Sequence, residues 1–478
     1  MSQRSSRRTI ITGLGPITAF GVGIQPLWSA LCEGRSAIKR ISRFDPSGFP
    51  CQLAAELPDE MFDVKSVVPK SYRKATKVMA RDIELAVGAA AAAVADAGLI
   101  TKAVDPEKTP TIPPARFGCH IGAGLIAADV DELTSALITS AKDQDLPTSR
   151  SADLAIDSSG ATAIAQITTS PHQRVSKPFD LSHWGHTGMN NLTPLWLLKY
   201  LPNMLACHVT IIHDCQGPSN TITCAETSAA LSIGESMRVI ERGAADACLS
   251  GGAEFKINPM GLLRQVFAKR LVQTNGENAS AEIVRPFDPA ACGSVLGEGG
   301  GILVLEEMQT ARARGATPYA ELVGFAATQA HCPDGVGLEI EEDGLSISDA
   351  VEAALAAAKV TAAEIDAIAP FGSSIPHIDH SETAAIQRVF GGRAAHIPII
   401  TTIPNVGNCC AGASAIPVIA AAMSLRTQTL PARLHTSAAT DLDANAVPSR
   451  PANLRHILVM STGVGGQNAA LVLKRIEA

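Results

Sequence analysis

The chain has 478 residues, of which 46% are hydrophobic and 18% are charged, and its formal net charge is −7. A chain of this length and hydropathy can bury a large core, and its composition excludes a disordered or fibrous protein. The negative net charge gives no electrostatic footprint for nucleic acid. Its 11 cysteines show no CxxC or CxxH pattern, which argues against a zinc site or a disulfide framework.

These features predict a protein of the reduced cytoplasm. The basic start, residues 1–8, runs into a strand-like segment that Gly and Pro soon interrupt, unlike a signal peptide. The longest apolar run, residues 85–94, is rich in Ala and too short to span a bilayer. We therefore expect no membrane insertion.

Apolar strands alternate with helices of small residues along the first half of the chain. The pattern predicts strands at 9–12, 117–121, 209–212, 221–224 and 247–250, and helices at 24–34, 80–98 and 227–242. From about 140 to 191 the chain is rich in Ser, Thr, Asp and His, which predicts a polar surface insertion.

The second half of the chain shows the same alternation of strands and helices. It predicts strands at 301–305, 319–323, 365–369, 399–402, 456–461 and 469–472, and helices at 347–358, 381–390 and 413–425. Such alternation favours an α/β fold whose sheets are covered by helices. We expect two similar halves, residues 1–270 with the polar insertion and residues 271–478.

A strand, a sharp turn and a helix of small residues follow one another between Gly217 and Gly234. The turn places one side chain at the N-terminus of a buried helix, where free N–H groups and the helix dipole favour negative charge. Such a position suits a thiolate nucleophile, and it equally suits a carboxylate that caps the helix.

This segment resembles the nucleophile elbow of type I/II β-ketoacyl-ACP synthases of the thiolase superfamily. The resemblance extends over nearly the whole chain and is carried by further motifs at 11–15, 28–31, 34–38, 201–204, 243–246, 250–254, 285–288, 297–301 and 303–306. It implies a five-layered α-β-α-β-α sandwich, and a dimer with the strand 221–224 near its axis.

The resemblance also implies a mechanism. In the family a cysteine takes the acyl chain from an acyl carrier protein, and two histidines promote decarboxylation of malonyl-ACP with support from a lysine and a glutamate. Backbone N–H groups form the oxyanion hole. In this sequence the hole's gating loop corresponds to Gly463, Val464, Gly465 and Gly466.

Most of the chemical groups are replaced here. The family's cysteine lies eight residues after the Pro of Gly-Pro and seven before the Ile of Ile-Gly, and both counts lead to Glu226. The two histidine positions hold Phe371 and Asn408, and the lysine position holds Ile403, whereas the glutamate is retained as Glu382. A family mechanism at Glu226 is therefore not expected.

Two readings of the elbow stay open. Glu226 is either a structural or partner-facing carboxylate, or an active acid or base whose pKa burial has raised. Cys224 is the nucleophile only if two compensating gaps shift the alignment by two residues.

The remaining candidates lie outside the elbow. Lys70, Arg73 and Lys74 form a basic cluster that either starts a solvated helix or, by the resemblance, meets an acidic carrier protein. His377 and His380 flank Asp379, but the family has a plain loop-to-helix turn there, so we expect no metal site. We expect no cofactor.

The sequence thus favours a non-condensing subunit similar to the chain-length factors of fatty-acid or polyketide synthesis. Such a subunit pairs with a catalytically intact ketosynthase and shapes the acyl tunnel, and a homodimer is the other possible assembly. A first alternative is an enzyme, either a malonyl-ACP decarboxylase or a divergent 3-oxoacyl-ACP synthase that uses Cys224. A second alternative is a stand-alone acyl-chain binding protein.

Overall fold

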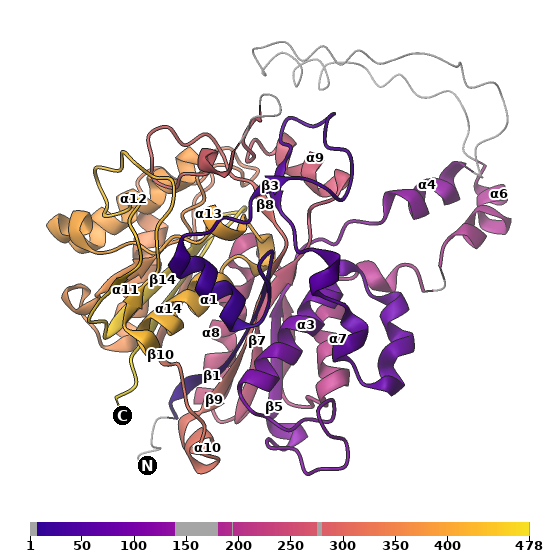
Figure 1. Ribbon diagram of the computed structural model, residues 1–478, viewed down its shortest axis with the longest axis horizontal. Coiled ribbons are helices and arrows are strands. Elements are labelled where there is room, and N and C mark those ends of the chain that lie inside the picture. The colour runs from indigo at the N-terminus through magenta and orange to yellow at the C-terminus, as the bar shows by residue number, and fades with distance from the viewer. Residues whose placement is uncertain (1–6, 139–179, 194, 275–279, 478) are drawn as a thin grey trace. The chain divides into compact units, whose positions relative to one another are not determined.

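The computed structural model describes residues 7–138, 180–193, 195–274 and 280–477 (Figure 1). Most of the polar insertion expected at 140–191 lies outside these ranges. The chain divides into a large unit, Met1–Ala127 with Leu197–Ala478, and a small unit, Ala128–Trp196. In the small unit the described elements are α4 (Val130–Ile138), α6 (Leu181–His186) and the 3₁₀ turn Gly188–Asn191.

The large unit is built on a ten-stranded sheet with the order β11-β14-β15-β10-β1-β9-β7-β5-β6, in which β2 pairs with β1. The strands are β1 (Thr9–Thr18), β2 (Gly21–Val22), β5 (Phe117–Gly122), β6 (Ser219–Ile222), β7 (Ala247–Glu254), β9 (Gly299–Glu307), β10 (Ala320–Gln329), β11 (Ala367–Ala369), β14 (His456–Thr462) and β15 (Gln467–Lys474). Only three residue pairs, Thr9–Ile11 with Ala320–Leu322, join β1 to β10, so the sheet consists of two groups of strands.

Helices complete five layers. In the middle layer α8 (Ser228–Glu241) and α14 (Ala415–Thr427) each contact strands of both groups. One outer layer holds α3 (Arg81–Asp96) and α7 (Met204–His213), and the other holds α11 (Leu345–Ala358) and α12 (Pro376–Phe390), as Figure 1 shows. The expected five-layered sandwich is confirmed.

Shorter elements connect these layers. They are α1 (Ile24–Glu33), α2 (Val64–Val67), α9 (Pro259–Phe267), α10 (Met308–Ala313) and α13 (Ile403–Val406), with the short strands β3 (Lys39–Arg40), β4 (Leu53–Ala55), β8 (Leu296–Gly297), β12 (Thr429–Leu430) and β13 (Arg450–Pro451).

The Ala-rich sequence of α3 lets this helix lie unusually close to β1. A Cβ on Gly13 would meet the Ala93 carbonyl oxygen at 2.4 Å, and one on Gly15 would meet the Ala89 carbonyl oxygen at 2.0 Å. Only glycine permits such a backbone approach, so a larger residue at either position would push α3 away from β1.

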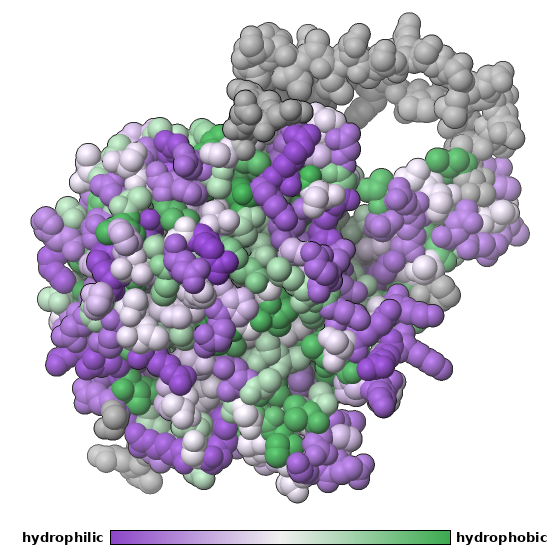
Figure 2. All heavy atoms as spheres, in the orientation of Figure 1, coloured by the Kyte–Doolittle hydropathy of each residue, from purple (hydrophilic) through white to green (hydrophobic). Residues whose placement is uncertain are grey.

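The middle layer explains an apolar stretch that by length and composition alone could cross a membrane. The stretch Cys410–Thr427 has 18 residues and a mean hydropathy of 1.3, and 89% of it is buried inside the protein. It is a core helix between the two groups of strands. On the outer surface, Figure 2 shows hydrophilic side chains over much of the visible face and hydrophobic ones in smaller groups.

Two predicted strands are wrong. Residues 209–212 lie within α7, because a short apolar run has no periodicity that separates a buried strand from a buried helix. Residues 399–402 form no strand, and only Ile399 makes an isolated bridge to Ile368 of β11.

Candidate functional site

The elbow is a tight turn between β6 and α8. Ala225 adopts a positive φ of 47°, a strained conformation for a residue with a side chain. The hydroxyl of Ser228, the first residue of α8, accepts a hydrogen bond from the Cys224 N–H at 2.8 Å and donates one to the Ala225 carbonyl oxygen at 2.6 Å. This turn holds Glu226 in a buried 3₁₀ turn at the start of α8.

Three donors from distant segments meet the carboxylate of Glu226. The Arg270 guanidinium donates to Oε1 at 2.6 Å, and the Asn408 side-chain amide donates to the same oxygen at 3.1 Å. The backbone N–H of Val464 donates to Oε2 at 3.1 Å. Burial opposes ionisation of Glu226, but the Arg270 charge and these hydrogen bonds outweigh it, so the pKa lies below its usual value.

The structure thus brings the expected gating loop to the elbow. The loop is folded by its own hydrogen bonds, from the Gly463 N–H to the Gln467 carbonyl and from the Gly466 N–H to the Gly463 carbonyl, both at 3.0 Å. Gly465 and Gly466 have φ values of 90° and 79°, which glycine adopts without strain. The N–H of Val464 is the group of this loop that reaches Glu226.

The other positions inferred from the family are buried with Glu226 in the large unit. Phe371 and Ile403 are both buried in the same apolar cluster, and neither side chain can exchange a proton. Asn408 contacts Glu226, and its Oδ1 accepts the Cys410 N–H at 2.8 Å.

Glu382 has a structural environment here. Its two carboxyl oxygens accept the backbone N–H groups of Phe371 and Gly372, each at 2.8 Å. The neighbouring Asp379 accepts the N–H groups of Ser373 and Ser374 in the same way. Burial, together with the charge of Asp379, raises the pKa of Glu382 to about 8, and burial raises that of Asp379 to about 6. The two carboxyl groups hold the loop 371–374 in place.

Arg270 was not found by the sequence analysis. It follows α9, next to Lys269 with its φ of 54°, and its side chain is 2% exposed. Its Nε has no partner among the described residues. In the sequence Arg270 directly follows Lys269, and nothing there distinguishes the two cations. Glu226 lies 44 residues away, so this pairing follows only from the tertiary fold.

No thiol near the elbow is activated. Cys224 lies two residues before Glu226, and burial raises the pKa of its thiol. Burial also raises the pKa of Cys410 to about 12, although Lys256 and Arg270 act in the opposite direction. A nucleophilic cysteine requires a lowered pKa, which neither residue has.

The basic cluster lies apart from the buried groups. Lys70, Arg73 and Lys74 belong to the 3₁₀ segment Lys70–Val78, and all three are exposed. His377 Nε2 donates to the Leu338 carbonyl oxygen at 3.2 Å, while Asp379 is enclosed by backbone donors. Among the described residues, no group of three or more His, Cys, Asp or Glu side chains is placed to hold a metal ion.

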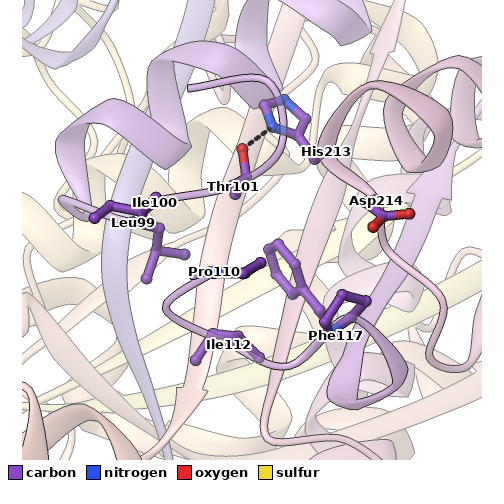
Figure 3. Close-up of a pocket in the computed structure, with 9 residues that line it drawn as sticks. Leu99, Ile100, Thr101, Pro110, Ile112, Phe117, His213 and Asp214 are labelled. Carbon is purple, nitrogen blue, oxygen red and sulfur yellow. Dashed lines mark hydrogen bonds between the residues drawn. The ribbon is translucent and has the colours of Figure 1, made fainter. Parts of the chain in front are cut away.

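A separate apolar pocket, shown in Figure 3, lies at the other end of the sheet. It includes Phe117 at the start of β5, whereas the elbow follows Ile222, which pairs with Gly122 at the end of β5. In this pocket His213 Nδ1 is 2.9 Å from the Thr101 hydroxyl. The pocket is therefore no part of the elbow site.

Comparison with known proteins places two family models on the chain. The model "Beta-ketoacyl synthase, N-terminal domain" matches residues 6–311, and "Beta-ketoacyl synthase, C-terminal domain" matches residues 319–437. The 3-oxoacyl-[acyl-carrier-protein] synthase 2 of Coxiella burnetii is 30% identical, over 98% of this chain and 99% of its own length. The provisionally named polyketide beta-ketoacyl synthase 1 of Streptomyces halstedii is 30% identical over 98% of both chains.

Solved structures show the same fold. The ishigamide ketosynthase/chain length factor matches with a TM-score of 0.76 and 24% identity, covering 99% of this chain and 100% of that one. A beta-ketoacyl synthase from Burkholderia phymatum matches with a TM-score of 0.75 and 24% identity, covering 98% of this chain and 100% of that one.

Proposed function

This chain belongs to the β-ketoacyl synthase family of fatty-acid and polyketide biosynthesis, and from that premise we propose that it is a non-condensing subunit. In this proposal it pairs with a catalytically intact ketosynthase and shapes the acyl tunnel as a chain-length factor does. The observation that carries the proposal is the ionised Glu226, held at the elbow by Arg270, Asn408 and Val464.

The chemistry of the elbow supports this proposal. Acyl transfer from a carrier protein needs a thiolate that attacks the thioester, and a carboxylate fixed by an ion pair is a poor nucleophile for that step. Decarboxylation of malonyl-ACP needs groups that stabilise the developing enolate. Phe371 offers none, and the amide of Asn408 is already directed at Glu226.

The edge of the sheet supports the partner assignment. Among the described residues β6 is the last strand of the sheet and pairs only with β5, and its residues are exposed or half-buried. An open strand edge is a template for pairing with another chain. In the heterodimer, the ketosynthase chain would pair with β6 and extend the sheet. In a homodimer, β6 of a second copy of this chain would take that place.

The exposed Lys70, Arg73 and Lys74 are proposed as the contact for an acyl carrier protein. A solved structure with 22% identity to this chain and a TM-score of 0.76 contains a "type II PKS acyl-carrier protein in complex with its ketosynthase". Exposed cations that face an acidic partner increase the association rate more than the affinity.

We also propose a cytoplasmic location. The chain would divide into two functional halves, residues 1–270 and residues 271–478.

The structure disfavours the enzyme alternatives. A decarboxylase in which Glu226 imitates an amide requires a protonated carboxyl group, whereas Arg270 lowers the pKa of Glu226. A synthase that uses Cys224 requires an activated thiol, whereas burial raises the pKa of Cys224.

Reconstitution with an intact homologue tests the proposal. Co-expression with a ketosynthase that retains its cysteine and both histidines should give a stable heterodimer on size-exclusion chromatography. The heterodimer should form β-ketoacyl products whose chain length differs from those of the ketosynthase alone. Failure to associate with any such ketosynthase encoded beside this chain would favour the stand-alone acyl-binding protein instead.

A further inference from the structure

Four segments that are far apart in the sequence converge on one buried carboxylate. They are the elbow, the segment after α9, the turn between α13 and α14, and the gating loop 463–466. Their contacts with Glu226 span 44, 182 and 238 residues of sequence. A contact set of this kind ties parts of the chain that secondary structure alone does not connect.

The charges in this set balance each other. The side chains of Glu226 and Arg270 are each 2% exposed, so neither ion is stabilised by bulk water. A buried ion pair is tolerated only when its geometry is good and further hydrogen bonds satisfy its atoms. Asn408 and Val464 supply those bonds to the carboxylate.

We propose that Arg270 makes the former catalytic elbow into a permanent clamp on the gating loop. The N–H of Val464, which in an active site would face the oxyanion of a reacting thioester, is already occupied by Glu226 Oε2. Arg270 supplies the positive charge that keeps this carboxylate ionised. The loop is therefore fastened to the elbow whether or not an acyl group is present.

The hydrogen bonds of the loop show where the clamp acts. The Gly463 and Gly466 N–H groups bond within 463–467, and the Gly465 N–H bonds to the Gly337 carbonyl at 2.8 Å. Only the Val464 N–H, among these four, depends on Glu226. Removing the carboxylate should therefore free one amide and leave the others bonded.

This inference deepens the proposed function, on which its consequence for acyl transfer rests. A clamp that occupies the oxyanion hole prevents the hole from accepting a substrate carbonyl. The tie between loop and elbow itself is a property of the isolated chain, so it can be tested without any partner or carrier protein.

Hydrogen–deuterium exchange of the Val464 amide is the direct test. We expect exchange at least about tenfold faster in Glu226→Ala and in Arg270→Gln than in the wild type. The Gly465 amide should keep its wild-type rate in both. Because Glu226→Ala leaves Arg270 without a counter-charge and can unfold the protein, the double variant Glu226→Leu/Arg270→Met provides a second test, since it leaves no unpaired charge and no acceptor for the Val464 N–H, and the same direction is expected.

A matched control separates the clamp from general destabilisation. Glu306 is also buried and paired with an arginine, Arg314, but it lies on β9 and bonds to Thr12. Glu306→Ala should lower the melting temperature and leave the Val464 exchange rate unchanged. Equal Val464 protection in wild type and the Glu226 variants, or equal loss of protection in Glu306→Ala, would overturn the clamp while leaving the non-condensing role intact.

Discussion

At the scale of single residues, the elbow combines a retained backbone turn with a new pair of charges. Ala225 keeps the strained φ of 47°, and Ser228 braces the turn, although no nucleophile follows. An active member of the family would place a thiolate and an imidazole here. This chain has Glu226 at the position matched to the cysteine and Phe371 and Asn408 at those matched to the histidines. Arg270, from the segment after α9, pairs with Glu226.

The interaction between Glu226 and Arg270 should be strongly non-additive. Removing one partner of a buried ion pair typically costs about 3–5 kcal/mol, whereas replacing both can be nearly neutral. We therefore expect Glu226→Gln and Arg270→Met each to lower the free energy of unfolding markedly, and the double variant to lose less than their sum. Urea unfolding of all four proteins measures this coupling, and simple additivity would show that the two charges do not interact.

Restoring a cysteine should not restore condensation. A thiol in Glu226→Cys would lie at a helix N-terminus beside Arg270, and both features lower a thiol pKa. Because position 226 is buried, we expect this cysteine to be acylated only slowly, as measured by peptide mapping. No condensation should follow, because Phe371 and Asn408 supply no imidazole.

The smallest set that could condense adds Phe371→His and Asn408→His to Glu226→Cys. Robust condensation by Glu226→Cys alone would show that the two histidine positions are misassigned.

At this scale the resemblance to the family pointed to Glu226 through its spacing from Gly-Pro and Ile-Gly, and to Phe371, Ile403 and Asn408 through matching family motifs. It did not predict Arg270 or the Val464 contact. Both depend on which distant segments the fold brings to the elbow, and spacing along the chain carries no information about that.

At the scale of elements, β6 is the strand that can extend the sheet into a partner. The N–H of Thr221 donates to the Asn220 side chain at 2.8 Å, whereas the Pro218 and Ile222 carbonyls accept bonds from the β5 side. The backbone N–H of Thr221 therefore takes no part in the pairing with β5, and pairing with another chain would replace its bond to the Asn220 side chain.

Thr221→Pro should therefore abolish dimer formation, because proline offers no N–H to a partner strand. The melting temperature of the monomer should change little, and Thr221→Ala should dimerise normally. Light scattering coupled to size-exclusion chromatography measures the dimerisation of both variants, and thermal unfolding measures the melting temperature. A proline variant that dimerises like the wild type would exclude β6 as the interface strand.

Elements with clear periodicity were predicted well. The helices at 80–98 and 227–242 correspond to α3 and α8 within two residues at each end. The sequence predicts a strand at 209–212, since three apolar residues and one threonine fit either structure, and their place in α7 depends on packing against α3 and β5.

At the scale of the whole molecule, the resemblance predicted the five layers correctly, and the alternation of strands and helices indicated the α/β class. The joining of the two groups of strands through only Thr9–Ile11 is a tertiary feature that no local pattern predicts. Buried ionisable groups are likewise a property of the folded whole, and they make its stability depend on pH.

Glu382 should give the clearest pH signature. Its folded-state pKa of about 8 lies above the ordinary value of 4.5, so its contribution to stability is fully present below pH 4.5 and is lost as pH rises through 8. The difference in melting temperature between wild type and Glu382→Gln should therefore shrink between pH 5 and 8.5. A difference that grows with pH would mean that Glu382 is ionised in the folded protein.

The central claim is that this chain does not form an acyl-enzyme or condense. The purified protein should be incubated alone with acyl-ACP and malonyl-ACP, and both the products and the peptide that contains Glu226 should be analysed by mass spectrometry. We predict no β-ketoacyl product and no acyl adduct on Cys224 or Glu226. Product formation at about 1 s⁻¹ or faster, an ordinary enzyme rate, would contradict the account.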